Sequence, residues 1–224
     1  MAGINRQGSY LASVRERVQL SSDAFQLDLQ RPEGFSFLAG QGIRISIDGL
    51  EREYSLVCGP DDGSLSICVK VIEGGALSPR LARLKIGTTV SFSGPHGCFT
   101  FQSRQHLPVF VATGTGIAPF VAMARAGIRG FTLLHGASTG DRLFYRELTQ
   151  PVATKYVGCV TRENGMRGDE SWKYHGRVSD FLLGEFASGV YDFYLCGGRE
   201  MVGNVLSTVD QRFPASRVFF EIFF

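Results

Sequence analysis

Apolar and polar residues alternate over short stretches of the first hundred residues, as in Gln26-Leu27-Asp28-Leu29 and Arg44-Ile45-Ser46-Ile47. This two-residue period is typical of half-buried strands. Turn-forming segments at residues 32–34 and 60–63, each with a proline and a glycine, separate the alternating stretches. We predict a closed antiparallel β-barrel whose strands span residues 11–20, 24–29, 42–47, 54–58, 65–71 and 89–93.

From about residue 104 the pattern changes, because apolar runs now alternate with amphipathic segments. This order predicts a doubly wound α/β domain, with a parallel sheet and helices on both of its faces. Its strands are expected at residues 109–113, 131–135, 155–160, 191–196 and 218–222, and its helices at residues 117–126, 142–150, 178–186 and 200–213. We therefore predict two domains, residues 1–103 and 104–224, with a linker near residues 102–108.

The segment at residues 108–119 joins an apolar strand to a helix through Thr113, Gly114, Thr115 and Gly116. Such a turn exposes backbone N–H groups at the positive end of a helix, which suits a pyrophosphate. An ordinary strand-to-helix turn explains the segment equally well. It is not the dinucleotide fingerprint, because Pro119 stands where the third glycine belongs. Cys196-Gly197-Gly198 repeats the arrangement, so both turns are expected at one crevice beyond the carboxyl ends of the strands.

Charge and composition exclude several functions. The net charge of +2 gives no support to nucleic-acid or membrane-surface binding. The chain starts without an apolar signal segment and has no apolar run near the ~20 residues of a membrane helix, so we expect a cytoplasmic protein. None of the five cysteines has C-x-x-C spacing and the four histidines are isolated, so no metal site is predicted.

Four further motifs could carry chemistry, although each also has an ordinary structural explanation. Arg52-Glu53-Tyr54-Ser55 could hold a phosphate, stack on a flat ring and hydrogen-bond its edge, or it could be only an edge strand. Gly74-Gly75 before Ser78-Pro79 predicts a helix capped by Ser78, with a second anion site. Gly94-Pro95-His96-Gly97 is expected to be a tight turn, and the apolar C-terminus, which contains Glu221, a last core strand.

Taken together and in this order, the motifs resemble those of ferredoxin–NADP reductase-type flavoproteins, nearest to the small bacterial kind. The matching motifs span nearly the whole chain. They are Arg52-x-Tyr54-Ser55, Gly74-Gly75-x-x-Ser78, Gly94-Pro95-x-Gly97, Thr113-Gly114-x-Gly116-Ile117-Ala118-Pro119, Thr161-Arg162-Glu163, Gly176-Arg177-Val178, Cys196-Gly197-Gly198 with Met201, and a terminal Glu-x-aromatic-aromatic.

The resemblance implies FAD as the flavin and assigns its binding residues in the first domain. Arg52 would contact the FAD pyrophosphate together with the backbone of residues 74–78. Tyr54 would stack on the isoalloxazine, Ser55 would hydrogen-bond near N5, and the backbone of residues 69–71 would run along the ring. The full set is Arg52, Tyr54, Ser55, Val69, Lys70, Val71, Gly74, Gly75, Leu77 and Ser78, with Phe223 or Phe224 covering the flavin or its adenine.

The second domain would bind NADP(H), with NAD(H) as the alternative. Thr113, Gly114, Thr115 and Gly116 would hold the pyrophosphate, and Cys196, Gly197 and Met201 would line the nicotinamide pocket. Arg162 and Arg177 match positions that grip the 2′-phosphate, whose recognition suits the planar guanidinium. No acidic residue is obvious in the sequence where a ribose diol would bind. One departure from the family is that Ser138-Thr139 replaces an arginine that small bacterial relatives often carry.

The implied reaction is hydride transfer between NADPH and the flavin, with single electrons passing to or from a ferredoxin or flavodoxin. Ser55, Cys196 and Glu221 are the expected catalytic residues, Glu221 as a proton-handling group, and the active site is expected between the domains. Arg80, Arg83 and Lys85 could dock an acidic carrier or could be a solvated helix face. We expect a monomer. The alternatives are an oxygenase reductase component, a reductase of free flavin, and a nucleotide-binding module without turnover.

Overall fold

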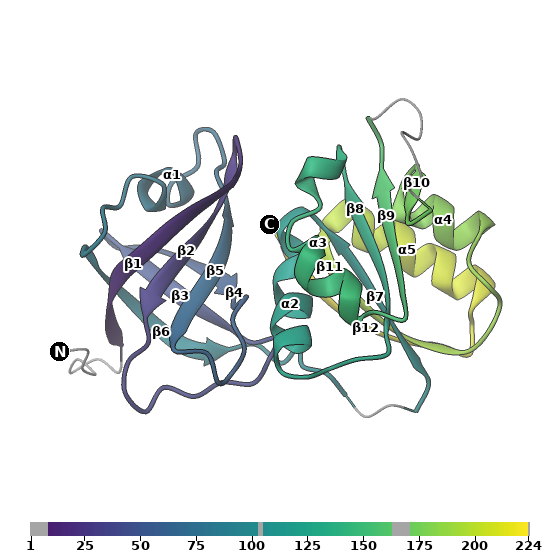
Figure 1. Cartoon of the computed structure of the whole chain (residues 1–224), viewed down its shortest axis with the longest axis horizontal. Coiled ribbons are helices and arrows are strands. Elements are labelled where there is room, and N and C mark those ends of the chain that lie inside the picture. The colour runs from purple at the N-terminus through teal and green to yellow at the C-terminus, as the bar shows by residue number, and fades with distance from the viewer. Residues whose placement is uncertain (1–8, 103–104, 163–170, 224) are drawn as a thin grey trace. The chain divides into compact units, whose positions relative to one another are not determined.

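The computed structural model describes residues 9–102, 105–162 and 171–223 (Figure 1). Contacts divide the chain into two compact units: Met1–Phe101 with Val121–Ala126, and Gln102–Phe120 with Gly127–Phe224. The helix α2 (Ala118–Arg125) therefore contributes residues to both units. The domain boundary between residues 103 and 104 stays a prediction from the sequence.

The first unit is built on an antiparallel sheet of six strands in the order β4-β3-β6-β1-β2-β5. An isolated bridge between Leu56 and Ile67 joins the two ends of this order, so the sheet closes into the predicted barrel. Alternate residues such as Leu27 and Ile43 are fully buried and fill its interior. The elements are β1 (Tyr10–Ser21), β2 (Ala24–Gln30), β3 (Gly42–Ile47), β4 (Leu50–Ser55), β5 (Ser64–Lys70), β6 (Thr89–His96) and α1 (Ser78–Leu81).

Two predictions in this unit were wrong. The strand expected at residues 54–58 is β4, which begins at Leu50, because Asp48 and Gly49, both with positive φ, form a two-residue hairpin turn between β3 and β4. The tight turn expected at residues 94–97 lies largely within β6, which continues past Gly94-Pro95 to His96. A register shift between the two strands accommodates this continuation: two steps along β3, from Gly42 to Arg44, face three steps along β6, from His96 to Ser93.

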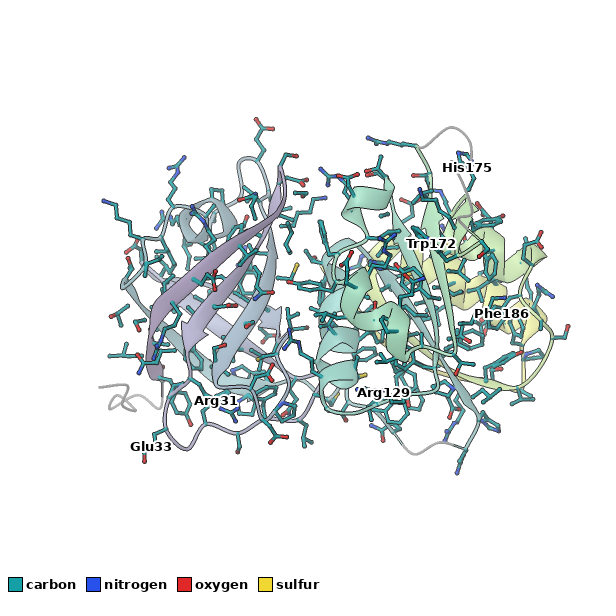
Figure 2. The ribbon with its side chains drawn as sticks, viewed as in Figure 1. Arg31, Glu33, Arg129, Trp172, His175 and Phe186 are labelled. Carbon is teal, nitrogen blue, oxygen red and sulfur yellow. The ribbon has the colours of Figure 1, made fainter. Side chains whose placement is uncertain are left out.

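Arg31 secures the loop that follows β2, where Figure 2 labels it beside Glu33. Its Nε and Nη2 donate to the Phe35 carbonyl over 3.0 and 2.7 Å, and its Nη1 donates to the Asp62 carbonyl over 2.8 Å. One guanidinium thus satisfies carbonyl groups from two separate loops, which is why a long polar side chain is partly buried here.

The second unit contains a parallel sheet of six strands in the order β10-β9-β8-β7-β11-β12. The order reverses between β7 and β11, which creates a crevice at their carboxyl ends. The helices α4 and α5 cover one face around Val111 and Leu195, whereas the Phe110 ring stacks on Phe120 of α2 on the other face. The strands are β7 (Leu107–Thr113), β8 (Thr132–Ala137), β9 (Lys155–Val160), β10 (Lys173–His175), β11 (Tyr191–Gly198) and β12 (Arg217–Phe223).

The expected helices α4 (Val178–Gly184) and α5 (Arg199–Arg212) are confirmed, but the helix expected at residues 142–150 is broken. It consists of the 3-10 helix η2 (Gly140–Arg142), the short helix α3 (Arg146–Thr149) and the 3-10 helix η3 (Gln150–Val152). Tyr145 interrupts it with a left-handed φ of 59°. The strand β10 was not predicted, because its three residues are too few to show a period.

The amino ends of three strands are held by one buried carboxylate. Asp192 accepts hydrogen bonds from Nε and Nη2 of Arg217 at 2.8 and 2.6 Å and from Nδ1 of His106 at 3.0 Å. These residues lie at or just before the starts of β11, β12 and β7. The Arg217 guanidinium and the His106 bonds lower the pKa of Asp192 to about 2, against the opposing effect of its burial.

We expect Asp192→Asn to destabilise the protein by about 2 kcal/mol at pH 7, because the lowered pKa of Asp192 corresponds to about that much stabilisation by Arg217 and His106. Since the pKa is lower in the folded state, the ionised carboxylate stabilises fully above about pH 4, and this contribution disappears as the pH falls toward 2. Urea unfolding of both proteins between pH 7 and 2 measures the difference. The exposed Asp210→Asn is the control, and a difference that does not shrink in acid would contradict the assignment.

Candidate functional site

Two glycine-containing turns touch each other at the carboxyl edge of the second unit. The 3-10 helix η1 (Gly114–Ile117) follows β7, and β11 beside it ends at Gly198. A Cβ on Gly116 would overlap the Cys196 carbonyl oxygen and lie 2.8 Å from the Gly197 Cα. The sequence-based expectation that these two segments lie together is therefore confirmed, and the reason for glycine at position 116 is backbone-to-backbone contact.

Two more glycines extend this close packing. A Cβ on Gly197, whose φ is 155°, would overlap the Thr113 hydroxyl and lie 2.8 Å from the Met201 Cε. Thr113 and Met201 were both predicted site residues, and the structure brings them together around Gly197. Gly136 at the end of β8 was missed, although a Cβ there would be 2.8 Å from the Thr113 Cγ2. The sequence feature that could have marked Gly136 is its place as a glycine directly after the strand predicted at residues 131–135.

Cys196 and Glu221 are neighbours on adjacent parallel strands. They are register partners of β11 and β12, and the Cys196 Sγ lies 3.9 Å from the Glu221 Oε2. Cys196 is fully buried, and this burial, followed by the Glu221 charge, raises the pKa of its thiol well above the usual value. The group at position 196 is thus a neutral thiol, able to donate to the carboxylate. Phe223 pairs with Gly198 at the same edge, and Phe224 lies outside the described residues.

The two predicted phosphate-binding arginines also follow strands at this edge. Arg162 comes just after β9, is exposed, and donates its backbone N–H to the Ser138 carbonyl, which follows β8, over 2.8 Å. Arg177 precedes α4, and its Nη1 donates to Oε1 of Glu200 at 3.0 Å. An acidic residue that the sequence did not reveal is therefore present beside Arg177, contributed by the first turn of α5.

The predicted flavin residues of β4 lie on a strand at one end of the sheet order of the first unit. Arg52 and Tyr54 pair with the core residues Ile45 and Ile43, so the alternation of this strand places them on one side, as predicted. Arg52 is exposed, Tyr54 is half-buried, and Ser55 is buried. Burial raises the pKa of Tyr54 to about 12, so its phenol stays protonated.

The bridge from Leu56 to Ile67 is antiparallel, so residues 52–55 run beside residues 68–71 at the end of β5. Within the described part of this unit the sheet order pairs β4 only with β3 and β5 only with β2. The facing sides of these two edges can therefore present backbone groups to the polar edge of a planar ligand. Val69 is buried, Lys70 is exposed and Val71 is half-buried, which agrees with a role for their backbone rather than their side chains.

The segment between β5 and α1 contains the remaining predicted flavin residues. The Gly75 N–H donates to the Ile72 carbonyl at 2.9 Å, and Gly74 before it has a φ of 71°. The prediction that Ser78 caps α1 was wrong, since Leu77 is the N-cap residue. The Ser78 hydroxyl instead accepts the Ile72 N–H at 3.0 Å, which folds the glycine turn back on the helix. Leu77 is buried in the barrel core, so only its backbone can face a ligand.

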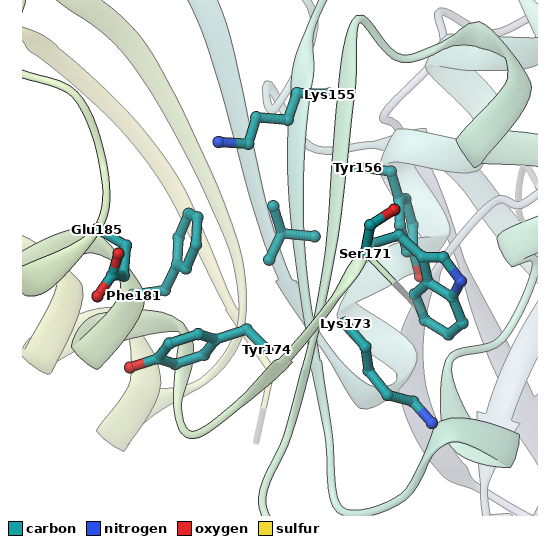
Figure 3. A pocket seen from close by; sticks show the side chains of 9 residues that line it. Lys155, Tyr156, Ser171, Lys173, Tyr174, Phe181 and Glu185 are labelled. Carbon is teal, nitrogen blue, oxygen red and sulfur yellow. The ribbon is translucent and has the colours of Figure 1, made fainter. Parts of the chain in front are cut away.

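A cavity of about 490 Å³ lies elsewhere on the second unit, as Figure 3 shows. It contains none of the predicted site residues. Lys155 at the amino end of β9, Trp172, Tyr174 and Phe181 are among the residues that line it. We do not place the coenzyme there, because phosphate-binding turns in parallel sheets lie at the carboxyl ends of strands.

Comparison with known proteins identifies both units. The models of the oxidoreductase FAD-binding domain and the oxidoreductase NAD-binding domain match residues 11–101 and 110–206. The flavodoxin/ferredoxin–NADP reductase of Escherichia coli (strain K12) is 33% identical over 209 residues, which cover 83% of this chain and 84% of that protein. The chain belongs to the ferredoxin–NADP reductase family.

Two further comparisons agree with membership of this family. The toluate 1,2-dioxygenase electron transfer component of Pseudomonas putida is 28% identical over 213 residues, covering 88% of this chain, which spans 62% of that protein. A ferredoxin NADP+ reductase from Neisseria gonorrhoeae, solved with bound FAD and NADP, matches with a TM-score of 0.81 at 20% identity and shares the fold over 96% of this chain and 99% of that one.

The predicted cofactors fit the two domains. The FAD-binding match contains every predicted flavin residue from Arg52 to Ser78, and the NAD-binding match contains the turns around Gly116 and Gly197. At Gly114 and Gly198, in the same two turns, a Cβ would meet no atom within 4 Å, so a pyrophosphate has room to approach the backbone there. Among the residues that the structure describes, no helix is both long and apolar enough to cross a membrane.

We expect Gly116→Ala to disturb the turn at residues 114–117, because the methyl group of alanine has no room beside the Cys196 carbonyl. Overpacking of this kind costs about 1–3 kcal/mol. The melting temperature should fall by several degrees, and the dissociation constant for NADP⁺, measured by calorimetry, should rise at least tenfold. Gly203→Ala within α5 is the control, because a Cβ there meets no atom within 4 Å. Wild-type NADP⁺ affinity in Gly116→Ala would contradict this role for the turn.

Proposed function

We propose that this protein is an FAD-dependent oxidoreductase that exchanges hydride with NADPH and single electrons with a ferredoxin or flavodoxin. The observation that carries the proposal is the contact of the Gly114–Ile117 turn with Cys196 and Gly197. This contact joins the proposed phosphate-binding turn to the buried Cys196 and its half-buried neighbour Glu221 at the switch point of the sheet. The same chain carries Arg52, Tyr54 and Ser55 on an open edge of the flavin domain.

The residues of the chain would position and polarise the flavin and nicotinamide rings, while the bound cofactors supply the hydride and electron chemistry. The neutral phenol of Tyr54 offers a flat, half-buried face, and Ser55 next to it offers a hydroxyl. The Cys196 thiol forms an uncharged wall for a nicotinamide ring, and Glu221 behind it can hold a proton. Phe223, the register partner of Gly198, is the described terminal aromatic residue that can cover a ring.

NADPH is the proposed coenzyme, because Arg162 and Arg177 both follow strands at the carboxyl edge that the coenzyme turn occupies. Arg162 is exposed, and the Ser138 carbonyl accepts its backbone N–H, so its backbone is anchored near the end of β8 as well as β9. This link offsets the absence of an arginine at Ser138-Thr139.

A basic surface of the flavin domain supports an acidic carrier protein as the electron partner. Arg83 and Lys85 follow α1 and are exposed, and Ile86 beside them is 74% exposed. Arg80 contributes less charge than expected, because it pairs with Asp48 at 2.6 Å. An apolar residue among cations is a common composition for a transient docking surface that recognises an acidic protein.

A visible spectrum recorded before and after anaerobic addition of NADPH, and in a separate sample NADH, tests the function. We expect flavin absorbance that bleaches faster with NADPH, followed by recovery when oxidised ferredoxin or flavodoxin is added. Flavin that washes away during purification would favour a reductase of free flavin. Recovery only with an oxygenase-linked ferredoxin would favour the role of the toluate 1,2-dioxygenase electron transfer component. A protein that binds no flavin would contradict the proposal.

Charge reversal at Arg83 should weaken docking of the carrier without affecting the flavin. For Arg83→Glu we expect a several-fold rise in KM for the carrier at low salt, a smaller rise at high salt, and unchanged reduction of a small dye. Arg129→Glu, on an exposed loop of the other unit, is the charge-matched control. Equal carrier kinetics in the Arg83 variant and the wild type would show that the carrier docks on another surface.

A further inference from the structure

We infer that Glu200 determines coenzyme selectivity, because it competes with the coenzyme's 2′-phosphate for Arg177. The inference rests on the proposed NADPH-binding function and concerns a residue that the sequence motifs do not mark. Glu200 lies in the first turn of α5, directly after the Cys196-Gly197-Gly198 turn, and its Oε1 accepts from the Arg177 Nη1 at 3.0 Å.

Both members of this ion pair stand at the crevice rather than at the far side of the sheet. Arg177 follows β10, and the Gly176 N–H donates to the carbonyl of Val160, the last residue of β9. At position 178 the chain returns to the crevice, where the Val178 Cγ1 lies against Gly136 beside Thr113. The pair therefore connects the start of α4 to the start of α5 across the carboxyl edge.

The pair is held weakly enough to be exchanged. The side chains of Arg177 and Glu200 are 61% and 74% exposed, and ion pairs at such exposure add little stability. A phosphate dianion offers more charge and two oxygens in the geometry that a guanidinium prefers. Arg177 can thus leave Glu200 for the 2′-phosphate, while its backbone stays fixed by the Asp180 carboxylate at 3.0 Å.

The carboxylate of Glu200 then remains close to the phosphate and repels it. The same carboxylate can accept a hydrogen bond from the ribose hydroxyl of a coenzyme that lacks the phosphate, which is how acidic residues favour NAD. Glu200 therefore lowers the preference for NADPH and supports the use of NADH. The Arg177 guanidinium, which recognises the 2′-phosphate, and the Glu200 carboxylate, which recognises the ribose hydroxyl, thus lie side by side. The balance between them sets the selectivity.

Calorimetric titration with 2′,5′-ADP and with 5′-AMP, which differ only in the 2′-phosphate, measures the contribution of that phosphate without turnover. For Glu200→Gln we expect the dissociation constant for 2′,5′-ADP to fall about three- to tenfold, while that for 5′-AMP stays equal or rises. Arg177→Gln should weaken 2′,5′-ADP binding about tenfold and leave 5′-AMP binding unchanged. Glu185→Gln, at the other end of α4, removes the same charge and should change neither constant.

The double variant tests competition directly, because Glu200→Gln should improve 2′,5′-ADP binding less when Arg177 is already Gln. An equal improvement in both backgrounds would overturn competition for Arg177, and unchanged or weaker binding in the single variant would overturn the role of Glu200. Arg162→Ala separates this from the coenzyme proposal. If Arg162→Ala loses 2′,5′-ADP selectively, NADPH binding stands whatever Glu200 does. If neither Arg162→Ala nor Arg177→Gln loses 2′,5′-ADP selectively, the NADPH assignment itself fails.

Discussion

The close approach of two main chains at the carboxyl edge of the parallel sheet is the constraint on which the second unit depends. The turn after β7 contacts the end of β11 at Gly116, where the Cys196 carbonyl fills the space of a side chain. Gly136 and Gly197 allow the same closeness to Thr113 and its surroundings. This packing fixes the buried Cys196 beside the turn, whereas Gly114 and Gly198, where a Cβ would meet no atom within 4 Å, leave open space next to the backbone.

In the FAD-binding unit, the backbone groups offered to a ligand lie at strand edges rather than at the start of a helix. Its barrel closes through the bridge at Leu56 and Ile67, and the continuation of both edges past this bridge leaves polar backbone beside Tyr54 and Ser55. A barrel paired along its whole seam would offer no such groups to a ligand. We therefore propose that both units bind their cofactors through main-chain surfaces, to which side chains such as Arg52 and Arg162 add charge.

Periodicity was enough to predict the two architectures, since alternation over two residues and alternation of strands with helices are long-range signals. Ordered motifs gave the family and its cofactors. Local backbone geometry was not predictable in the same way. The hairpin turn at Asp48-Gly49 was overlooked, and no sequence feature predicts the left-handed φ of Tyr145. The pairing of Arg177 with Glu200 joins residues that are 23 positions apart, so only the folded chain reveals it.

The stabilising contacts of Asp192 and the candidate binding site lie at opposite ends of the parallel sheet. Asp192 binds Arg217 and His106 at the amino ends of the strands, whereas the glycine turns and exposed charges lie at the carboxyl ends. Much of the cohesion of the sheet is thus supplied far from the crevice. Residues around the crevice are consequently free to diversify, and a lineage can retune which coenzyme it consumes while the framework that carries the crevice persists.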